Sequence, residues 1–285
     1  MTHQVALLPG NRLHLQHGPI DIVARAWGEG DEVAAAYRQG AERFATVLEE
    51  IVAELPLLRR PLDAEPLVRG AVPRRMVAAC LPFADRFITP MAAVAGAVAD
   101  EVLAAMTAGR ALTKAYVNNG GDIALHLTSG ASLTAGIVDD QDAPHIDADA
   151  VLSHDFGVGG LATSGWRGRS LSLGIADAVT AFARSAALAD AAATLIANAV
   201  DVDHPAVTRR PASEVRDDTD LGGRLVTVDV GPLPEPAIVA AMSAGVAVAK
   251  ELRARGLVSH AYLALQGRRR AVARNSHGSL AGVQQ

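Results

Sequence analysis

Asp190 and Thr194 lie four positions apart in ARSAALADAAATLIANAVD (183–201), a run otherwise built of small and aliphatic side chains. On a helix, residues four apart emerge from the same face, one turn from each other. A carboxylate in such apolar company is solvated, caps a backbone group or holds a ligand. These two oxygen-bearing side chains are therefore the first candidates for chemistry.

A glycine pair in YVNNGGDIA (116–124) is the second candidate. Gly120 and Gly121 follow Asn119 and come directly before Asp122, at the mouth of an expected strand. Without a Cβ, this backbone can approach the polar groups of a ligand. A plain turn is the alternative interpretation.

The segment LATSGWRGRS (161–170) is the third candidate. Thr163, Ser164 and Gly165 offer amides and hydroxyls, and Arg167 lies close by in the sequence. Such a loop suits a phosphate or pyrophosphate, and a plain turn again remains open.

Other patterns carry less chemistry. SHDFG (153–157) places Ser, His and Asp side by side, but neighbouring residues on a strand point to opposite faces. HIDAD (145–149) and DVDH (201–204) are expected to be solvated acidic loops, with metal binding as the alternative. The only cysteine, Cys80, excludes an intrachain disulfide and is expected to be a buried small hydrophobe. The dinucleotide fingerprint, the P-loop, HExxH and GxSxG are absent.

Composition limits the class of protein. The 285 residues are half hydrophobic and carry a formal charge of -5, which argues against a nucleic-acid partner. The longest apolar run, residues 87–99, is shorter than the ~20 residues that span a bilayer, and no signal peptide is evident. We therefore expect a cytoplasmic protein with no membrane partner.

The expected elements follow from periodicity and turn residues. A helix is expected from Asp31 to Pro56, followed by a connection over 56–75 and a further helix from Thr89–Pro90. Small residues give the second helix a thin face around Gly96 that another backbone can approach. Later helices are expected from about Ser185 and from Pro236, and hairpins are expected at 17–19, at 118–121 and within 257–274.

These elements interleave without a strict βαβ rhythm, so we expect the α+β class, with mixed, largely antiparallel sheets packed with helices. The chain is expected to form a single domain over 1–285, possibly built as two packed halves, with a loose tail over 275–285. The alanine-rich faces suit packing within one chain or between two, which leaves a homodimer open.

Three motifs occur in a specific order. VNNGGDI (117–123), LATSG (161–165) and AALADAAAT (186–194) together resemble the ApbE-like family, flavin transferases that attach FMN from FAD to a threonine or serine of a target protein. GPIDI (18–22) and TPMAAVAGAVADEVL (89–103) resemble the UPF0280 branch of that superfamily, over roughly residues 10–265.

The resemblance implies that Asp190 and Thr194 ligate magnesium beside the FAD pyrophosphate. Magnesium prefers hard oxygen ligands and often combines a carboxylate with substrate phosphates. The glycine-pair and 163–165 loops, with Asn119, Asp122 and Arg167, would then seat the ligand. Mg²⁺ and FAD are the expected cofactors, with a nucleotide or other small molecule as ligand and a protein as acceptor.

One part of the transferase pattern is missing. After the LATSG loop, transferases carry a HIIDPxTG-like segment whose histidine activates the acceptor hydroxyl, whereas this chain has Leu171 or Leu173 at that position. Asp177 is the remaining candidate for the base. Three hypotheses follow: a magnesium-dependent flavin enzyme (an FMN transferase or an FAD-pyrophosphate-cleaving relative), an enzyme of another class that reuses the pocket, and a non-catalytic binding protein.

Overall fold

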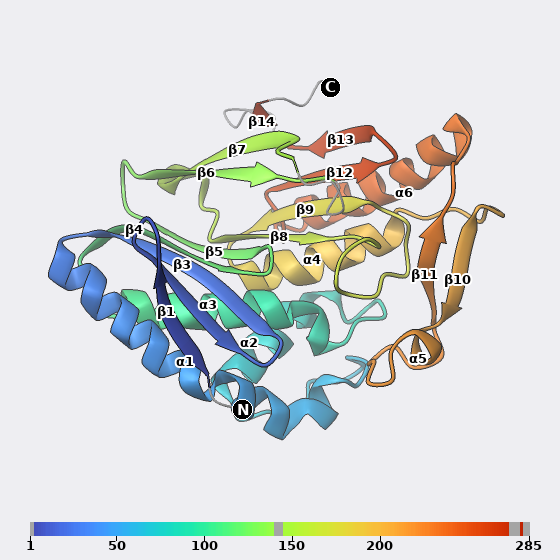
Figure 1. Ribbon diagram of the computed structural model, residues 1–285. Helices are drawn as coiled ribbons and strands as arrows, with labels where there is room; N and C mark the ends of the chain where they lie inside the picture. The colour runs from blue at the N-terminus through green and yellow to red at the C-terminus, as the bar shows by residue number, and fades with distance from the viewer. Residues whose placement is uncertain (1–2, 140–144, 274–279, 282–285) are drawn as a thin grey trace. The chain divides into compact units, whose positions relative to one another are not determined.

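The computed structural model describes residues 3–139, 145–273 and 280–281 (Figure 1). About 38% of the residues are helical and 30% lie in strands, and the paired strands run antiparallel, which confirms the α+β class. The chain divides into two compact units. Unit 1 comprises residues 1–133, 153–162 and 183–191, and unit 2 comprises residues 134–152, 163–182 and 192–285.

The sheet of unit 1 carries the predicted glycine pair. Its strands follow the order β1 (Gln4–Leu8), β2 (Arg12–His17), β3 (Ile20–Gly28), β4 (Leu112–Asn119), β5 (Asp122–Leu127) and the start of β8 (Gly160–Ser164). The β2–β3 and β4–β5 hairpins occur where they are predicted. Gly120 and Gly121 close the second hairpin with φ of 65° and 110°, a left-handed turn that suits glycine. Alternate residues of β2 and β3 are buried, so one face of the sheet forms the core.

Helices pack on this sheet in unit 1. α1 (Gly30–Leu58) packs against β2 and β3, and α3 (Val94–Thr107) packs against β4 and β5. A 3₁₀ turn (η2, Pro90–Ala93) precedes α3, as the Thr89–Pro90 signal indicates. Within the described residues, Pro90–Thr107 is the one segment long and apolar enough to cross a membrane, and half of it is buried, as in an ordinary core helix.

Two helix boundaries of unit 1 differ from the prediction. α1 begins one residue before Asp31 and continues past Pro56 to Leu58, which is fully buried. Proline at this position removes one backbone N–H donor but does not prevent the last residues from remaining helical. The expected connection 56–75 also contains the start of α2 (Ala71–Cys80), and the 3₁₀ turn η1 (Leu81–Phe83) follows that helix.

The sequence hides α2 because its first turn is capped from far away. Glu50 of α1 accepts the N–H of Val72 at 2.8 Å, and Glu54 accepts the N–H of Gly70 at 2.6 Å. The residues directly before α2 include no capping side chain, because both capping carboxylates come from α1.

Unit 2 contains the expected late elements. β9 (Ala178–Ala183), β12 (His260–Leu265) and β13 (Arg268–Val272) are neighbours in that order, and α6 (Glu235–Ala254) packs against β12 and β13. β6 (Ser132–Ile137), β7 (Ala148–Ser153) and β14 (Leu280–Ala281) form a second sheet. The rest of the predicted tail 275–285 lies outside the described residues.

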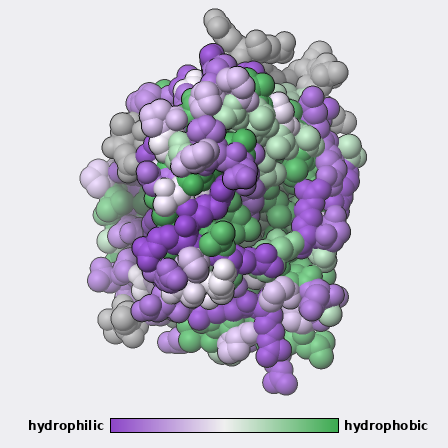
Figure 2. Space-filling model, turned by 90° about the vertical axis from the view of Figure 1, so that its right-hand side faces the viewer, coloured by the Kyte–Doolittle hydropathy of each residue, from purple (hydrophilic) through white to green (hydrophobic). Residues whose placement is uncertain are grey.

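The polar stretch 201–223 holds structure that its composition does not predict. β10 (Val207–Pro211) pairs with β11 (Leu225–Val230). A short helix, α5 (Ala212–Val215), follows β10 directly in the chain. The face of the molecule that carries these elements is largely hydrophilic, with smaller hydrophobic areas between the polar side chains (Figure 2). Alternate residues of β10 are exposed, and prolines lie just before it and at its end, which explains why this segment reads as a loop.

Candidate functional site

Helices α3 and α4 (Ala186–Ala199) cap each other's first turns. Asp100 of α3 accepts the N–H groups of Ala186 and Ala187 at 3.0 and 2.9 Å. In return, Asp190 of α4 accepts the N–H of Gly96 at 3.1 Å. The N–H groups of a first helical turn lack partners within the helix, so each carboxylate satisfies donors of the other helix.

The crossing of these helices depends on Gly96. A Cβ at this position would lie 2.3 Å from the carbonyl oxygen of Ala186. The thin face predicted for the second helix is therefore where another backbone approaches, as expected. Ser185 also caps α4 as predicted, because its hydroxyl accepts the N–H of Leu188 at 3.3 Å. The alanine-rich sequence of α4 thus serves close packing.

Asp190 lies in an electrostatically unfavourable place. Burial raises the pKa of its carboxyl group well above the usual range, and the negative charge of Asp122 raises it further. Asp122 is 8% exposed and begins β5 directly after the glycine pair. Asn119, also buried, donates to the carbonyl oxygen of Ala95 at 3.1 Å. Two carboxylates this close favour a bound cation or a shared proton.

Cys80, the last residue of α2, is not a nucleophile candidate. Its thiol is fully buried and points to the carbonyl oxygen of Thr89 at 3.5 Å. Burial, and then the charge of Asp190, raise the pKa of the thiol well above its usual value. The expected burial of Cys80 is confirmed. A thiol with a raised pKa is a poor nucleophile.

The carboxylates fit magnesium only as part of a larger ligand set. Among the described residues, no group of three or more His, Cys, Asp or Glu side chains could enclose a metal ion. Asp122 and Asp190 supply two carboxylates, and Thr194, partly exposed, lies one turn further along α4. Magnesium commonly takes one or two carboxylates and completes its shell with waters and phosphate oxygens. The residues therefore fit a magnesium ion that arrives with a phosphate ligand.

In unit 2, Asp177 holds the predicted anion-binding segment. Its Oδ1 accepts the indole N–H of Trp166 and the Nε–H of Arg167, both at 3.1 Å, and its Oδ2 accepts the N–H of Gln266 at 2.5 Å. The Arg167 guanidinium also lies 4.5 Å over the Trp166 ring. A carboxylate and an aromatic face thereby fix the direction of this cation.

The rest of the 161–170 segment is pressed against the strand that follows. A Cβ on Gly165 would lie 2.2 Å from the carbonyl oxygen of Asp177, so only glycine fits there. The hydroxyls of Thr163 and Thr180 lie 2.8 Å apart and share a hydrogen bond, while Ser164 is partly exposed. The expected loop is therefore wrong for Thr163 and Ser164, which end strand β8, and a turn with the anchored Arg167 follows them.

A second polar cluster in unit 2 corrects the prediction of a solvated loop at HIDAD. The Asp147 side chain is 1% exposed, pairs with Arg269, and lies 2.7 Å from the His145 ring nitrogen. Arg269 also contacts Asp139 at 2.6 Å, and Asp139 accepts the hydroxyl of the buried Tyr262 at 2.9 Å. Asp147 is buried because Arg269 compensates its charge. Residues 140–144 lie outside the described part of the chain.

The predicted site residues fall into two groups. Asn119, Gly120, Gly121, Asp122 and Asp190 belong to unit 1, and Thr163, Ser164, Gly165, Arg167, Asp177 and Thr194 belong to unit 2. That both groups serve one ligand stays a prediction. Sequence reasoning did not reveal the capping role of Asp100, and it missed Trp166 and Gln266, which carry no motif of their own.

Known proteins resemble the chain over most of its length. The family model described as AbpE bacteria matches residues 5–271. A UPF0280 protein of Methanopyrus kandleri is 35% identical over 168 residues, which cover 59% of this chain and 63% of the relative. A UPF0280 protein of Methanothrix thermoacetophila is 38% identical over 160 residues, which cover 55% and 65%. The matched region thus spans less than two thirds of these relatives.

Proposed function

Since the chain belongs to the AbpE bacteria family and is related to archaeal UPF0280 proteins, we propose that it binds a flavin nucleotide with Mg²⁺ and acts on the pyrophosphate. In the reaction, a hydroxyl oxygen of an acceptor protein bonds to the FMN phosphorus of FAD while the anhydride bond breaks and AMP leaves, or water takes the place of the acceptor and FMN and AMP are released. The observation that carries the proposal is the pair of carboxylates, Asp122 and Asp190, beside the turn formed by the glycine pair.

In this proposal, Asp122 and Asp190 hold the ion, with Thr194 as a further oxygen ligand. A bound magnesium ion neutralises charge that develops on phosphate oxygens as the anhydride breaks. Burial, and then the charge of Asp122, raise the pKa of Asp190, and a bound cation would offset the second of these two influences. Gly120 and Gly121 leave room for a ligand beside Asp122.

Arg167 is the proposed phosphate contact of unit 2, and Asp177 is the residue that positions it. Three donors occupy the two oxygens of Asp177, which suits orientation of Arg167 and Trp166 better than proton abstraction. If Asp177 positions Arg167, Asp177→Asn weakens ligand affinity. If Asp177 is instead the base, turnover falls while affinity is kept, and the pH profile loses its acidic limb.

The test of the proposal is a thermal-shift titration with FAD, FMN and ADP, each with and without Mg²⁺. A ligand at 100 times its Kd stabilises a protein by about 2.7 kcal/mol. We expect a magnesium-dependent shift with FAD for the wild type. Asp190→Asn should abolish the magnesium dependence, because it removes one of the two charges that hold the ion.

Asp100→Asn is the matched control. Asp100 also caps a helix with two backbone contacts, so both variants lose a similar structural interaction. Only the Asp190 variant should lose the ligand response. An unchanged melting temperature with FAD under every condition, or equal loss of response in both variants, would contradict the proposal.

A further inference from the structure

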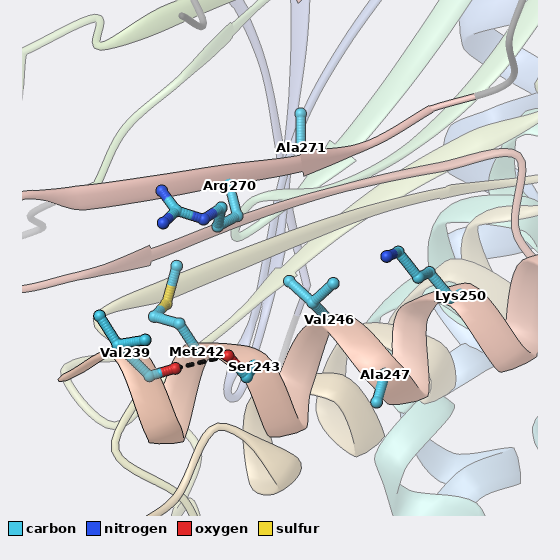
Figure 3. Close-up of a pocket in the computed structure, with 8 residues that line it drawn as sticks. All are labelled: Val239, Met242, Ser243, Val246, Ala247, Lys250, Arg270 and Ala271. Carbon is cyan, nitrogen blue, oxygen red and sulfur yellow. Dashed lines mark hydrogen bonds between the residues drawn. The ribbon is translucent and has the colours of Figure 1, made fainter. Parts of the chain in front are cut away.

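A groove in unit 2 lies outside all the residues assigned above. It runs between α6 and the edge strand β13 and encloses about 450 Å³ (Figure 3). Cavities of this size hold drug-sized small molecules. Its lining residues are Val239, Met242, Ser243, Val246, Ala247, Lys250, Arg270 and Ala271.

The groove has an apolar wall along α6. Val239, Met242 and Val246 follow one another at three- and four-residue spacing, so they share one face of the helix. Val239 is 44% exposed, whereas Met242 is 3% exposed and closes the floor. From Val239 to Lys250 the helix rises by about 16 Å, which allows an elongated ligand. The Ser243 hydroxyl donates to the Val239 carbonyl at 2.7 Å and adds no charge.

Two cations border this apolar wall. Arg270 extends over the Met242 end of the groove and Lys250 stands near the other end, as Figure 3 shows. Arg270 donates to the carbonyl oxygen of Arg269 at 2.9 Å, and no ion pair joins it or Lys250 to a carboxylate of the described residues. The groove lining itself contains no acidic residue.

The nearby carboxylates are already engaged with other cations. Glu235, in the first turn of α6, pairs with Arg268 at 3.0 Å. Glu251, next to Lys250, pairs with Arg255 at 3.4 Å. In a chain of net charge -5, two uncompensated cations therefore flank an exposed apolar trough. Charge complementarity favours an anion there, and the wall favours an apolar body.

We propose that this groove binds an amphipathic anion, a small molecule with an elongated apolar body and one carboxylate or phosphate head. The body lies on Val239, Met242 and Val246, and the head contacts Arg270 or Lys250. The site is separate from the proposed nucleotide site, and either can fail without the other.

Isothermal titration calorimetry tests the inference, with decanoate, decyl phosphate and decyltrimethylammonium below their micellar concentrations. The three probes share the apolar tail and differ in the head. We expect both anions to bind and the cation to bind at least tenfold more weakly. The better of the two anions identifies the head group as carboxylate or phosphate.

Matched variants locate the site. Arg270→Gln and Lys250→Gln should each weaken anion binding by about fivefold, the upper range for one partly exposed ion pair, and the double variant should weaken it further. Arg268→Gln and Arg255→Gln remove cations from the same strand and helix that already pair with glutamates, so binding should be unchanged. Ala247→Trp fills the groove while keeping both charges and should abolish binding.

Three results would overturn the inference. One is the absence of heat with both anions at two well-separated temperatures, since apolar burial can have an enthalpy near zero at a single temperature. The second is equal binding of all three probes. The third is binding that Arg270→Gln and Ala247→Trp leave intact, since the tail would then bind elsewhere. Melting temperatures of the variants should match the wild type, because the substituted side chains are exposed.

Discussion

Asp100 and Asp190 have the same side chain and the same capping role, but different charges act on them: the cation of Arg75 lowers the pKa of Asp100, whereas no cation is among the main influences on Asp190. After burial, the charge of Asp122 is the largest influence on the pKa of Asp190. The pKa of Asp100 is raised chiefly by burial, and the N–H groups of Ala187 and Ala186 oppose the rise. At the residue scale, surroundings rather than residue type distinguish a candidate ligand from a helix cap.

The raised pKa of Asp100 predicts a pH dependence of stability. An acid whose pKa is higher in the folded state than in the unfolded state binds its proton more tightly when folded. Its stabilising contribution is fully present below the unfolded pKa, about 3.9, and is lost as pH rises through the folded pKa. We therefore expect the unfolding free energy of the wild type, relative to Asp100→Asn, to increase as pH falls from 7 to 4.

Urea denaturation of both proteins at intervals across this range measures the difference. Comparison with the variant cancels the titration of all other carboxyl groups. A difference that stays constant, or that shrinks toward pH 4, would contradict the assignment of a raised pKa to Asp100.

Replacing Arg269 should lower the stability of the fold. It contacts both Asp139 and Asp147, and the Asp147 side chain is almost fully buried. Arg269→Gln leaves two carboxylates without their cation, so we expect a loss of about 3 kcal/mol of stability. Arg270→Gln, one position along the same strand, should change stability by less than about 0.5 kcal/mol. Equal unfolding midpoints for the two variants in guanidinium would refute this role.

At the element scale, α3 and the first turns of α4 are held by reciprocal contacts. Two carboxylates are exchanged between the helices, and glycine is required where the backbones approach. α3 has no side-chain cap from its own neighbouring residues. The contact from Asp190 satisfies one of the N–H groups in its first turn instead. Small residues in both helices are what make so close an approach possible.

Gly96→Ala tests this crossing. The added methyl group would lie within 3 Å of three backbone atoms of Ala186 and Ala187, which cannot move as a side chain can. We expect a loss of about 3 kcal/mol, at the upper end of overpacking costs. Gly30→Ala, at the start of α1, meets nothing within 4 Å and should be neutral or slightly stabilising. Chemical denaturation measures the unfolding free energies of the two variants. An unchanged unfolding free energy for Gly96→Ala would show that the helices separate at little cost.

At the scale of the whole molecule, one exposed surface bears on the open question of self-association. β1 is an edge strand without charged residues, and Val5 and Leu7 are 49% and 67% exposed. Natural edge strands usually carry charge or are covered. Such a strand favours association with another chain.

Leu7→Glu should therefore reduce concentration-dependent self-association and leave stability nearly unchanged. Light scattering after size-exclusion chromatography, over a tenfold range of protein concentration, measures the effect. Arg12→Glu, on the neighbouring strand, is a control for added negative charge. If the wild type stays monomeric at all concentrations, neither β1 nor the alanine-rich helix faces form a dimer.

Short-range rules account for much of the fold. Alternation and glycine turns predicted the β2–β3, β4–β5 and β12–β13 hairpins, and the helical period predicted α1, α3, α4 and α6. The order of three motifs pointed to the family that the comparison then found. These features depend on residues close together in the chain, so the sequence displays them directly.

Tertiary contacts decided what the polar groups do. Asp190 and Gly96 are 94 positions apart, and Arg269 and Asp147 are 122 apart. No local pattern shows that one carboxylate caps a distant helix, that Asp147 is buried, or that Asp177 clamps Arg167. The pKa and the partner of a charged group depend on what lies around it in space, and only the folded chain brings those groups together.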